Sequence, residues 1–189
     1  MTLLGRLIVY AAPSGSGKTT VVQHVLSVFP DLAFSISATT RARRDGEEDG
    51  RDYYFFDVDH FKMLIESGEF AEWEEVYPGQ YYGTLKAEIN RLREAGRHVV
   101  FDVDVKGAMS IKRLYPDETL TVFIKVPSME VLEQRLRTRG TDTEESLQKR
   151  LSKAAEELEF EPLFDVVLVN DVLEDTLCEA EDIVRNFLF

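Results

Sequence analysis

Short runs of apolar residues alternate along this chain with longer segments in which apolar residues recur every three or four positions. The first pattern is typical of buried β-strands and the second of amphipathic helices. Buried strands are expected at residues 7–11, 98–102, 120–126 and 166–169. Helices are expected at residues 20–26, 86–95, 106–114, 129–139, 143–159 and 173–186. Strands that alternate with helices in this way predict an α/β fold with a parallel sheet and right-handed crossovers.

Residues 33–84 have a different pattern, with one expected helix over residues 61–65 between short, aromatic-rich strands. We therefore expect a mostly antiparallel insert here, with a turn-rich exposed loop at residues 45–50. Residues 128–153 are expected to form a basic helix–loop–helix that acts as a lid. The expected core is made of the remaining segments, residues 1–32, 85–127 and 154–189.

The segment between the first strand and the first helix reads Ala-Pro-Ser-Gly-Ser-Gly-Lys-Thr at residues 12–19. It matches the pattern G-x-x-x-x-G-K-[ST] except that Ala12 takes the place of the first glycine. The two glycines let successive backbone N–H groups point at one phosphate, and Lys18 adds a mobile positive charge. Thr19 offers a hydroxyl to Mg²⁺. The pattern predicts a nucleotide phosphate site but not the reaction, and Ala12 is tolerated if its φ is negative.

Polar side chains also follow two later strands: Asp102 and Asp104 after one of them, and Asn170 after the last. Ligands of open α/β sheets bind at these carboxyl ends. Asp102 ends an apolar strand, which is the usual place of a carboxylate that holds Mg²⁺ directly or through water. The alternative is that Asp102 only caps the turn into the next helix. Given residues 12–19, we favour the metal role.

Candidate anion-binding residues gather in two places. Arg41, Arg43 and Arg44 lie near hydroxyl side chains and near Tyr53 and Tyr82 in the insert. Arginine forks bind phosphate oxygens in pairs, although these arginines can instead pair with the acidic residues at 47–49. The second group, on the expected lid, is Arg135, Arg137, Arg139 and Arg150, which can contact phosphates or pair with nearby acidic residues. Glu72 can accept two N–H bonds from a guanine edge, or it is simply an exposed Glu.

The charge balance is strongly acidic, with 35 Asp and Glu against 22 Lys and Arg in 189 residues, a net charge of −13. Nucleic acid and anionic membranes need a basic face, so neither partner is expected. No apolar run approaches the ~20 residues of a membrane span, and residues 1–6 lack a leader pattern. The one cysteine, Cys178, cannot form an internal disulfide, which fits a cytoplasmic protein. The acidic surface suggests a salt-rich environment as a further hypothesis.

Taken together, these residues resemble the guanylate kinase family over essentially the whole chain, from Arg6 to the last helix. The segments that carry the resemblance are residues 12–19, Ser37-x-Thr39-Thr40-Arg41-x-x-Arg44, Gly46-Glu47, Gly50-x-Asp52-Tyr53, Glu69-Phe70-x-Glu72-Trp73, Tyr81-Tyr82-Gly83-Thr84, Asp102-Val103-Asp104-x-x-Gly107, Arg139-Gly140-Thr141, Lys149-Arg150-Leu151 and Val169-Asn170-Asp171. The resemblance implies a P-loop NTPase core with helices on both faces, a small mixed-sheet GMP-binding insert and a helical lid. It implies transfer of the ATP γ-phosphate to GMP, and to dGMP, with Mg²⁺ by a monomer or homodimer.

The resemblance also implies roles by position. ATP would be bound by Ala12, Pro13, Ser14, Gly15, Ser16, Gly17, Lys18, Thr19 and Asn170. GMP would be bound by Ser37, Arg41, Arg44, Tyr53, Glu72, Tyr82, Thr84 and Asp104. The implied catalytic residues are Lys18, Arg41, Arg135, Arg139 and Arg150, and the expected Mg²⁺ ligands are Thr19 and Asp102. The chain departs from the family at Ala12, at Ala38, where Ser is frequent, and at Lys106, where Gln is usual.

Two other functions are compatible with parts of this pattern. The first is a kinase for another small phosphorylated molecule, such as a sugar phosphate. The presence of Glu72 and Thr84 argues against this function. The second is a catalytically inactive module that binds a phosphorylated peptide through Arg41, Arg44 and Tyr53. Such modules usually lose the lysine of the phosphate loop, and this chain keeps Lys18.

Overall fold

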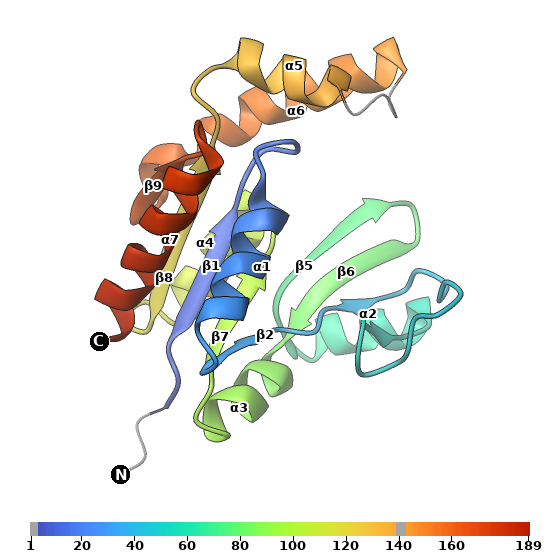
Figure 1. The fold of residues 1–189 in the computed structure, drawn as a ribbon. Helices are drawn as coiled ribbons and strands as arrows, with labels where there is room; N and C mark the ends of the chain where they lie inside the picture. Colours follow the sequence, from blue (N-terminus) through green and yellow to red (C-terminus); the bar gives the residue numbers. More distant parts are fainter. Residues whose placement is uncertain (1–3, 139–142) are drawn as a thin grey trace.

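The structure is a computed structural model that describes residues 4–138 and 143–189. Its centre is a five-stranded sheet in the order β2-β7-β1-β8-β9 with every pair parallel (Figure 1). The strands are β1 (Leu7–Ala11), β2 (Leu32–Phe34), β7 (His98–Asp102), β8 (Thr119–Lys125) and β9 (Val166–Val169). The expected parallel sheet is therefore confirmed. The sequence placed most of β2 in the insert, but Ala33 pairs with Val99 of β7, so residues 33 and 34 lie in the core sheet.

Helices cover both faces of this sheet. They are α1 (Lys18–Val28) and α7 (Leu173–Leu188) on one face, and α3 (Lys86–Glu94) and α4 (Val105–Leu114) on the other. Ile8 and Tyr10 of β1 pack on the side of α1 and α7, while Leu7, Val9 and Ala11 pack on the side of α3 and α4. A strand covered on both faces reads as an unbroken apolar run. No helix in the described ranges is long and apolar enough to cross a membrane.

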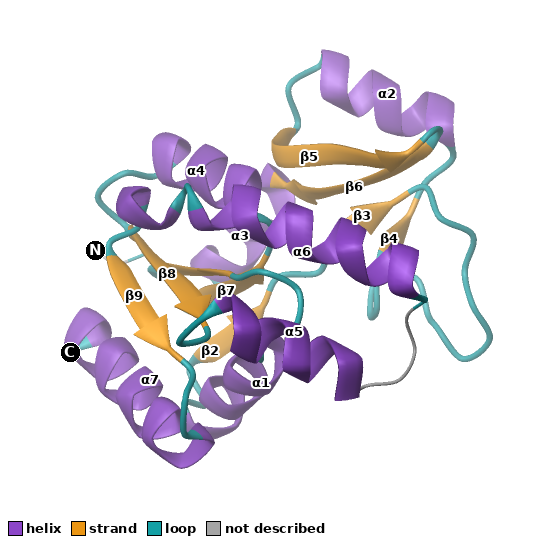
Figure 2. Ribbon diagram, turned by 90° about the horizontal axis from the view of Figure 1, so that it is seen from above, coloured by secondary structure: helices purple, strands orange, loops and turns teal. Residues whose placement is uncertain are grey.

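A second, four-stranded sheet lies beside the core in the order β4-β3-β6-β5 (Figures 1 and 2). Its elements are β3 (Ala38–Thr39), β4 (Tyr54–Phe55), α2 (Val58–Glu66), β5 (Phe70–Tyr77) and β6 (Gln80–Leu85). β3 and β4 are parallel and the other pairs are antiparallel, so the insert is mixed, as expected. Phe61 of α2 is fully buried and stacks on Phe70 of β5 with ring centroids 4.3 Å apart. The aromatic residues thus give the insert a small core of its own.

Two further helices, α5 (Met129–Thr138) and α6 (Glu144–Leu158), pack against each other beyond the end of the core sheet (Figure 1). Their contact has its own buried apolar residues, among them Leu132, Leu136 and Leu147. Thr143 caps α6, because its hydroxyl accepts a hydrogen bond from the N–H of Ser146 at 3.2 Å. The expected lid ends at residue 153, which lies inside α6. The short helix η1 (Glu161–Leu163) then leads into β9.

Candidate active site

The phosphate loop, residues 12–19, joins the end of β1 to the start of α1. Gly15 and Gly17 have φ values of 99° and 90°, which other residues adopt only with strain. A side chain at Gly17 would also clash with the amide nitrogen of Asn170. Among the residues that the structure describes, only glycines have positive φ, so Ala12 has a negative φ, and it is buried. Its methyl group is therefore compatible with this loop.

Asn170, which follows β9, is hydrogen-bonded to the phosphate loop. It is buried, and its amide donates a hydrogen bond to the carbonyl of Ser16 at 2.8 Å. Arg135 of α5 donates to the carbonyl oxygens of Asn170 and Asp171 at 2.9 and 3.3 Å. Gly15, Gly17, Arg135 and Asn170 border a cavity of about 480 Å³. Arg135 thus borders a different cavity from Lys18.

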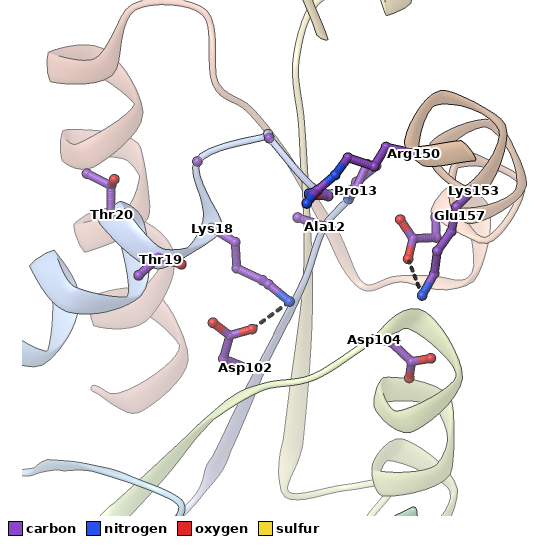
Figure 3. A pocket seen from close by; sticks show the side chains of 13 residues that line it. Ala12, Pro13, Lys18, Thr19, Thr20, Asp102, Asp104, Arg150, Lys153 and Glu157 are labelled. Carbon is purple, nitrogen blue, oxygen red and sulfur yellow. Dashed lines mark hydrogen bonds and ion pairs between the residues drawn. The ribbon is translucent and has the colours of Figure 1, made fainter. Parts of the chain in front are cut away.

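On the other side of the loop is a cavity of about 410 Å³ (Figure 3). The Nζ atom of Lys18 lies 2.5 Å from Oδ1 of Asp102 and donates to the carbonyl of Val103 at 3.0 Å. This pairing follows from the sheet, since β1 and β7 are neighbours and bring the loop next to Asp102. Thr19 lines the cavity, and Arg150 of α6, which also lines it, donates to the hydroxyl of Ser14 at 2.8 Å. Several cations and several hydroxyl and carboxylate oxygens therefore surround one space.

A third cavity, of about 320 Å³, opens between the core and the insert. Among the residues that border it are Ser37, Tyr53, Glu72, Tyr82 and Asp104, together with Lys18 and Asp102. The first five of these residues are among those expected to bind GMP, whereas Lys18 and Asp102 belong to the phosphate site. Lys18, Asp102 and Asp104 line both cavities, so the two spaces meet at these three side chains.

Glu72 of β5 is held by Thr84 of β6, whose hydroxyl donates to Oε1 at 2.6 Å. Burial raises the pKa of Glu72 to about 7, and the bond from Thr84 opposes this shift only in part. Thr84 itself is buried. A Cβ atom on Gly107 would lie 3.1 Å from both Glu72 Oε2 and Asp104 Oδ1. Gly107 therefore leaves room for these two carboxylates at the start of α4.

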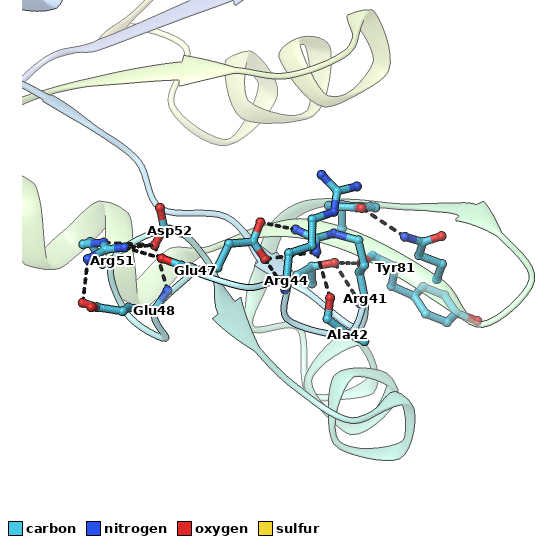
Figure 4. Close-up of polar contacts among 12 residues, drawn as sticks. Arg41, Ala42, Arg44, Glu47, Glu48, Arg51, Asp52 and Tyr81 are labelled. Atoms are coloured by element: carbon cyan, nitrogen blue, oxygen red, sulfur yellow. Dashed lines mark hydrogen bonds and ion pairs between the residues drawn. The ribbon is translucent and has the colours of Figure 1, made fainter.

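Arg41 forms a paired hydrogen bond with Glu47, at 2.8 Å from Nη2 and 3.1 Å from Nη1 (Figure 4). Glu47 also accepts from the backbone N–H of Arg44 at 2.8 Å. The bonds from Arg41 and then from Arg44 lower the pKa of Glu47. The guanidinium of Arg41 lies over the ring of Tyr53, 5.3 Å from its centroid, and Tyr53 packs edge-on to Tyr82. The acidic loop thus orients Arg41 beside the two tyrosines, while Arg44 is exposed.

The structure brings together most of the expected site residues, but not all of them. Arg41, Arg44 and Thr84 do not border the cavity between core and insert, and Ser16 is a buried residue of the phosphate loop. Arg135 and Asn170 border the cavity of about 480 Å³ and not the phosphate cavity. Arg139 lies outside the described residues. Sequence reasoning missed Lys153 and Glu157, which border the phosphate cavity from α6. Their spacing of three and seven residues from Arg150 on one helix is the signal that would have found them.

Comparison with known proteins agrees with this geometry. The family model described as Guanylate kinase matches residues 4–187. A guanylate kinase of Bacteroides thetaiotaomicron is 45% identical over 98% of this chain and 91% of its own length. A guanylate kinase of Salinibacter ruber is 45% identical over 96% of both chains. The crystal structure of guanylate kinase from Anaplasma phagocytophilum is 31% identical, with a TM-score of 0.74 over 98% of this chain and 87% of that one. This chain belongs to the guanylate kinase family.

Proposed function

We propose that this protein is an ATP:GMP phosphotransferase, which transfers the γ-phosphate of ATP to GMP, or to dGMP, and gives ADP and GDP or dGDP. The observation that carries the proposal is the meeting of two cavities at Lys18, Asp102 and Asp104. One cavity has a nucleotide phosphate loop, and the other has Glu72 as an acceptor for guanine. Such an arrangement suits direct transfer between two bound nucleotides, since it lets their phosphates approach each other.

In this proposal the phosphate loop binds the ATP phosphates through its backbone N–H groups, and Lys18 binds the β- and γ-phosphates. Arg41, Arg44, Tyr53 and Tyr82 bind the phosphate of GMP, with Arg41 oriented by Glu47. Glu72 accepts hydrogen bonds from N1 and N2 of guanine, and Thr84 positions its carboxylate. Ser37 and Asp104 complete the base site, while Asn170 supports the loop that binds ATP.

Mg²⁺ is part of the proposal because the oxygen donors suit it. Thr19 and Asp102 border the phosphate cavity and supply a hydroxyl and a carboxylate, the hard ligands that Mg²⁺ prefers. Among the described residues, no three His, Cys, Asp or Glu side chains gather as a complete metal site. Mg²⁺ bound to nucleotides uses few protein ligands, so a donor pair of this kind is sufficient. When bound, the ion neutralises charge on the ATP phosphates.

The transfer itself needs little covalent chemistry from the protein. An oxygen of the GMP phosphate attacks the γ-phosphorus in line, the bond to the β–γ bridging oxygen breaks, and ADP leaves with that electron pair. No general base is required, because the GMP phosphate is already anionic near neutral pH. Lys18 and Arg150, which border the phosphate cavity, neutralise charge on the phosphoryl group that is transferred, and Arg139 is assigned the same role. Arg135 takes part only after a movement of α5, because here it binds the carbonyl oxygens of Asn170 and Asp171.

A coupled assay of ADP release tests this function directly. ATP and Mg²⁺ are supplied with GMP, dGMP, AMP, CMP or UMP in separate reactions. Release with GMP and dGMP alone is expected, because Glu72 matches the donors of guanine and not those of the other bases. Release with all five acceptors, or with none, contradicts the proposal. A folded protein that binds GMP in calorimetry without releasing ADP would instead favour a phosphate-binding module.

We also propose a cytoplasmic enzyme that acts as a monomer or homodimer. Cys178 has no second cysteine in the chain with which to form a disulfide, so a reducing compartment suits the protein. Both cavities of the proposed reaction are formed within one chain. Light scattering after gel filtration distinguishes the two assemblies.

A further inference from the structure

The phosphate cavity contains one cation to which the proposed mechanism gives no role, Lys153 of α6. Lys153 and Glu157 extend from the same side of α6 as Arg150, and both border the cavity opposite Lys18 and Asp104 (Figure 3). Residues three and four apart on a helix are neighbours. The turn of α6 after Arg150 therefore brings a second cation to the space where the phosphates of ATP would lie.

The charges around this cavity balance without a ligand. The described cations that border it are Lys18, Arg150 and Lys153, and the described carboxylates are Asp102, Asp104 and Glu157. A polyphosphate brings several negative charges into this space. Its binding therefore requires cations that can leave a carboxylate partner and bind a phosphate oxygen instead. Lys18, with its partner Asp102, is one such cation.

The pair of Lys153 and Glu157 is well suited to such an exchange. Its nitrogen and oxygen are 4.0 Å apart, which is an ion pair but not a hydrogen bond. The side chain of Lys153 is 60% exposed, whereas that of Glu157 is 12% exposed. Burial raises the pKa of Glu157, and Lys153 and Lys18 both act against that shift. Glu157 is thus a fixed partner, and Lys153 is a flexible and weakly held cation.

We propose that Lys153 is a further phosphate-binding residue, which leaves Glu157 and binds an oxygen of the ATP polyphosphate. The inference rests on the proposed function, because it assumes that ATP occupies the phosphate cavity. It assigns to α6 a second contact with ATP, one turn beyond Arg150. The ligand group is a phosphate oxygen, and the bond is a charge-assisted hydrogen bond from Nζ.

The same helix offers a matched control in Lys149. Its Nζ atom lies 2.7 Å from Oε1 of Glu145, and the two side chains are 74% and 80% exposed. Lys149 therefore has an acidic partner four residues away, as Lys153 does, but it borders none of the cavities described above. Replacing either lysine by alanine removes one charge from α6, and only Lys153→Ala removes it from the phosphate cavity.

The test compares the wild type with Lys153→Ala, Lys153→Arg and Lys149→Ala. Binding of the non-hydrolysable ATP analogue AMPPNP with Mg²⁺ is measured by calorimetry, and KM for ATP and for GMP by the coupled assay. Lys153→Ala should weaken AMPPNP binding and raise KM for ATP about tenfold, the lower end of what a hydrogen bond to a charged group contributes. KM for GMP should stay within about twofold. Lys153→Arg should restore most of the binding, and Lys149→Ala should match the wild type.

Equal AMPPNP affinity of Lys153→Ala and Lys149→Ala would overturn the inference, and so would a parallel rise of both KM values in Lys153→Ala. Failure of the proposed function gives a different result. In that case the wild type would not phosphorylate GMP, whereas the difference in AMPPNP affinity between the two alanine variants would remain. The calorimetric comparison thus tests Lys153 independently of the acceptor.

Discussion

At the scale of single residues, the ion pair of Lys18 and Asp102 lies where the two cavities meet. We expect Lys18→Ala to lower kcat at least about 100-fold, as loss of one electrostatic contact to a transition state does. The fold should persist, because the core does not depend on this side chain. Steady-state kinetics and circular dichroism check both parts. A kcat close to that of the wild type would contradict the assignment of residues 12–19 to ATP phosphates.

The raised pKa of Glu72 predicts an effect on stability. With a pKa of about 7 in the folded protein and about 4.3 when unfolded, the unfolded chain loses this proton first as pH rises. The folded state is therefore progressively disfavoured between these two values and carries the full penalty above about pH 7. Glu72→Gln, which mimics the protonated form, should raise the free energy of unfolding by roughly 1–3 kcal/mol at about pH 8.

Thermal unfolding at a series of pH values measures this gain, which should vanish near about pH 4 because both states are then protonated. Glu72→Gln keeps an oxygen for the hydroxyl of Thr84 but loses an acceptor for guanine. It should therefore raise KM for GMP by about tenfold or more, with KM for ATP nearly unchanged. A gain in stability that does not depend on pH, or an equal rise in both KM values, would rule out this account of Glu72.

At the scale of elements, the phosphate loop contains two small residues, Gly17 and Ala12, that differ in backbone conformation. Gly17→Ala places a methyl group at positive φ and against Asn170, so it should displace the loop and lower ATP affinity strongly. Ala12→Gly should change kcat less than about twofold and stability by no more than about 1 kcal/mol, because Ala12 already has an unstrained backbone. Calorimetry with AMPPNP and thermal unfolding compare the two variants. Similar losses in both would contradict the geometry of this loop.

The sequence predicts the elements where local pattern and burial agree. β1, the phosphate loop and the helices of the core follow from an unbroken apolar run, from glycine positions and from helical periodicity. The placement of β2 could not be predicted, because a strand of three residues shows no clear periodicity. Its pairing with β7 depends on contacts between residues far apart in the sequence. Likewise, β3 and β4 are only two residues long. β3 pairs with the edge of β6, and β4 pairs with β3 in turn, which are tertiary features that no local pattern contains.

For the site as well, the sequence predicts which types of residue are present but not which residues contact one another. The presence of Lys18, Asp102 and Glu72 at these cavities could be expected, because the roles proposed for them at phosphate, metal and guanine each require a particular chemistry. The pairing of Arg41 with Glu47, which the sequence left as an alternative to phosphate binding, also orients Arg41 beside Tyr53. The hydrogen bond from Thr84 to Glu72 and the position of Lys153 at the phosphate cavity depend on how β6 and α6 pack. Spacing along the chain does not report such packing.

At the scale of the whole molecule, three separate units supply one site. The core provides the phosphate loop, the insert provides Glu72 and Tyr82, and α6 provides Arg150 and Lys153. Each unit has its own buried apolar cluster, so each can keep its internal packing while its distance to the others changes. This construction suits a reaction that must admit two nucleotides and then exclude water from the transferred phosphoryl group.

The net charge of −13 gives the last prediction, because salt acts on the acidic surface and on the cationic site in opposite directions. The Debye length falls from about 10 Å at 0.1 M salt to about 3 Å at 1 M. Screening should therefore relieve repulsion within the acidic surface and raise Tm. It should also weaken the attraction of Arg41, Arg150 and Lys153 for anionic nucleotides and raise both KM values.

Potassium chloride is the appropriate salt for this measurement, because sulfate strengthens apolar burial and resembles the phosphate ligand. Thermal unfolding and the coupled assay are followed from roughly 0.1 to 1 M KCl. A Tm that rises while kcat is maintained would support adaptation to a salt-rich environment. A Tm that does not rise would show that repulsion among surface carboxylates contributes little to stability, and the hypothesis of a salt-rich environment would then fail even if the kinase activity is confirmed.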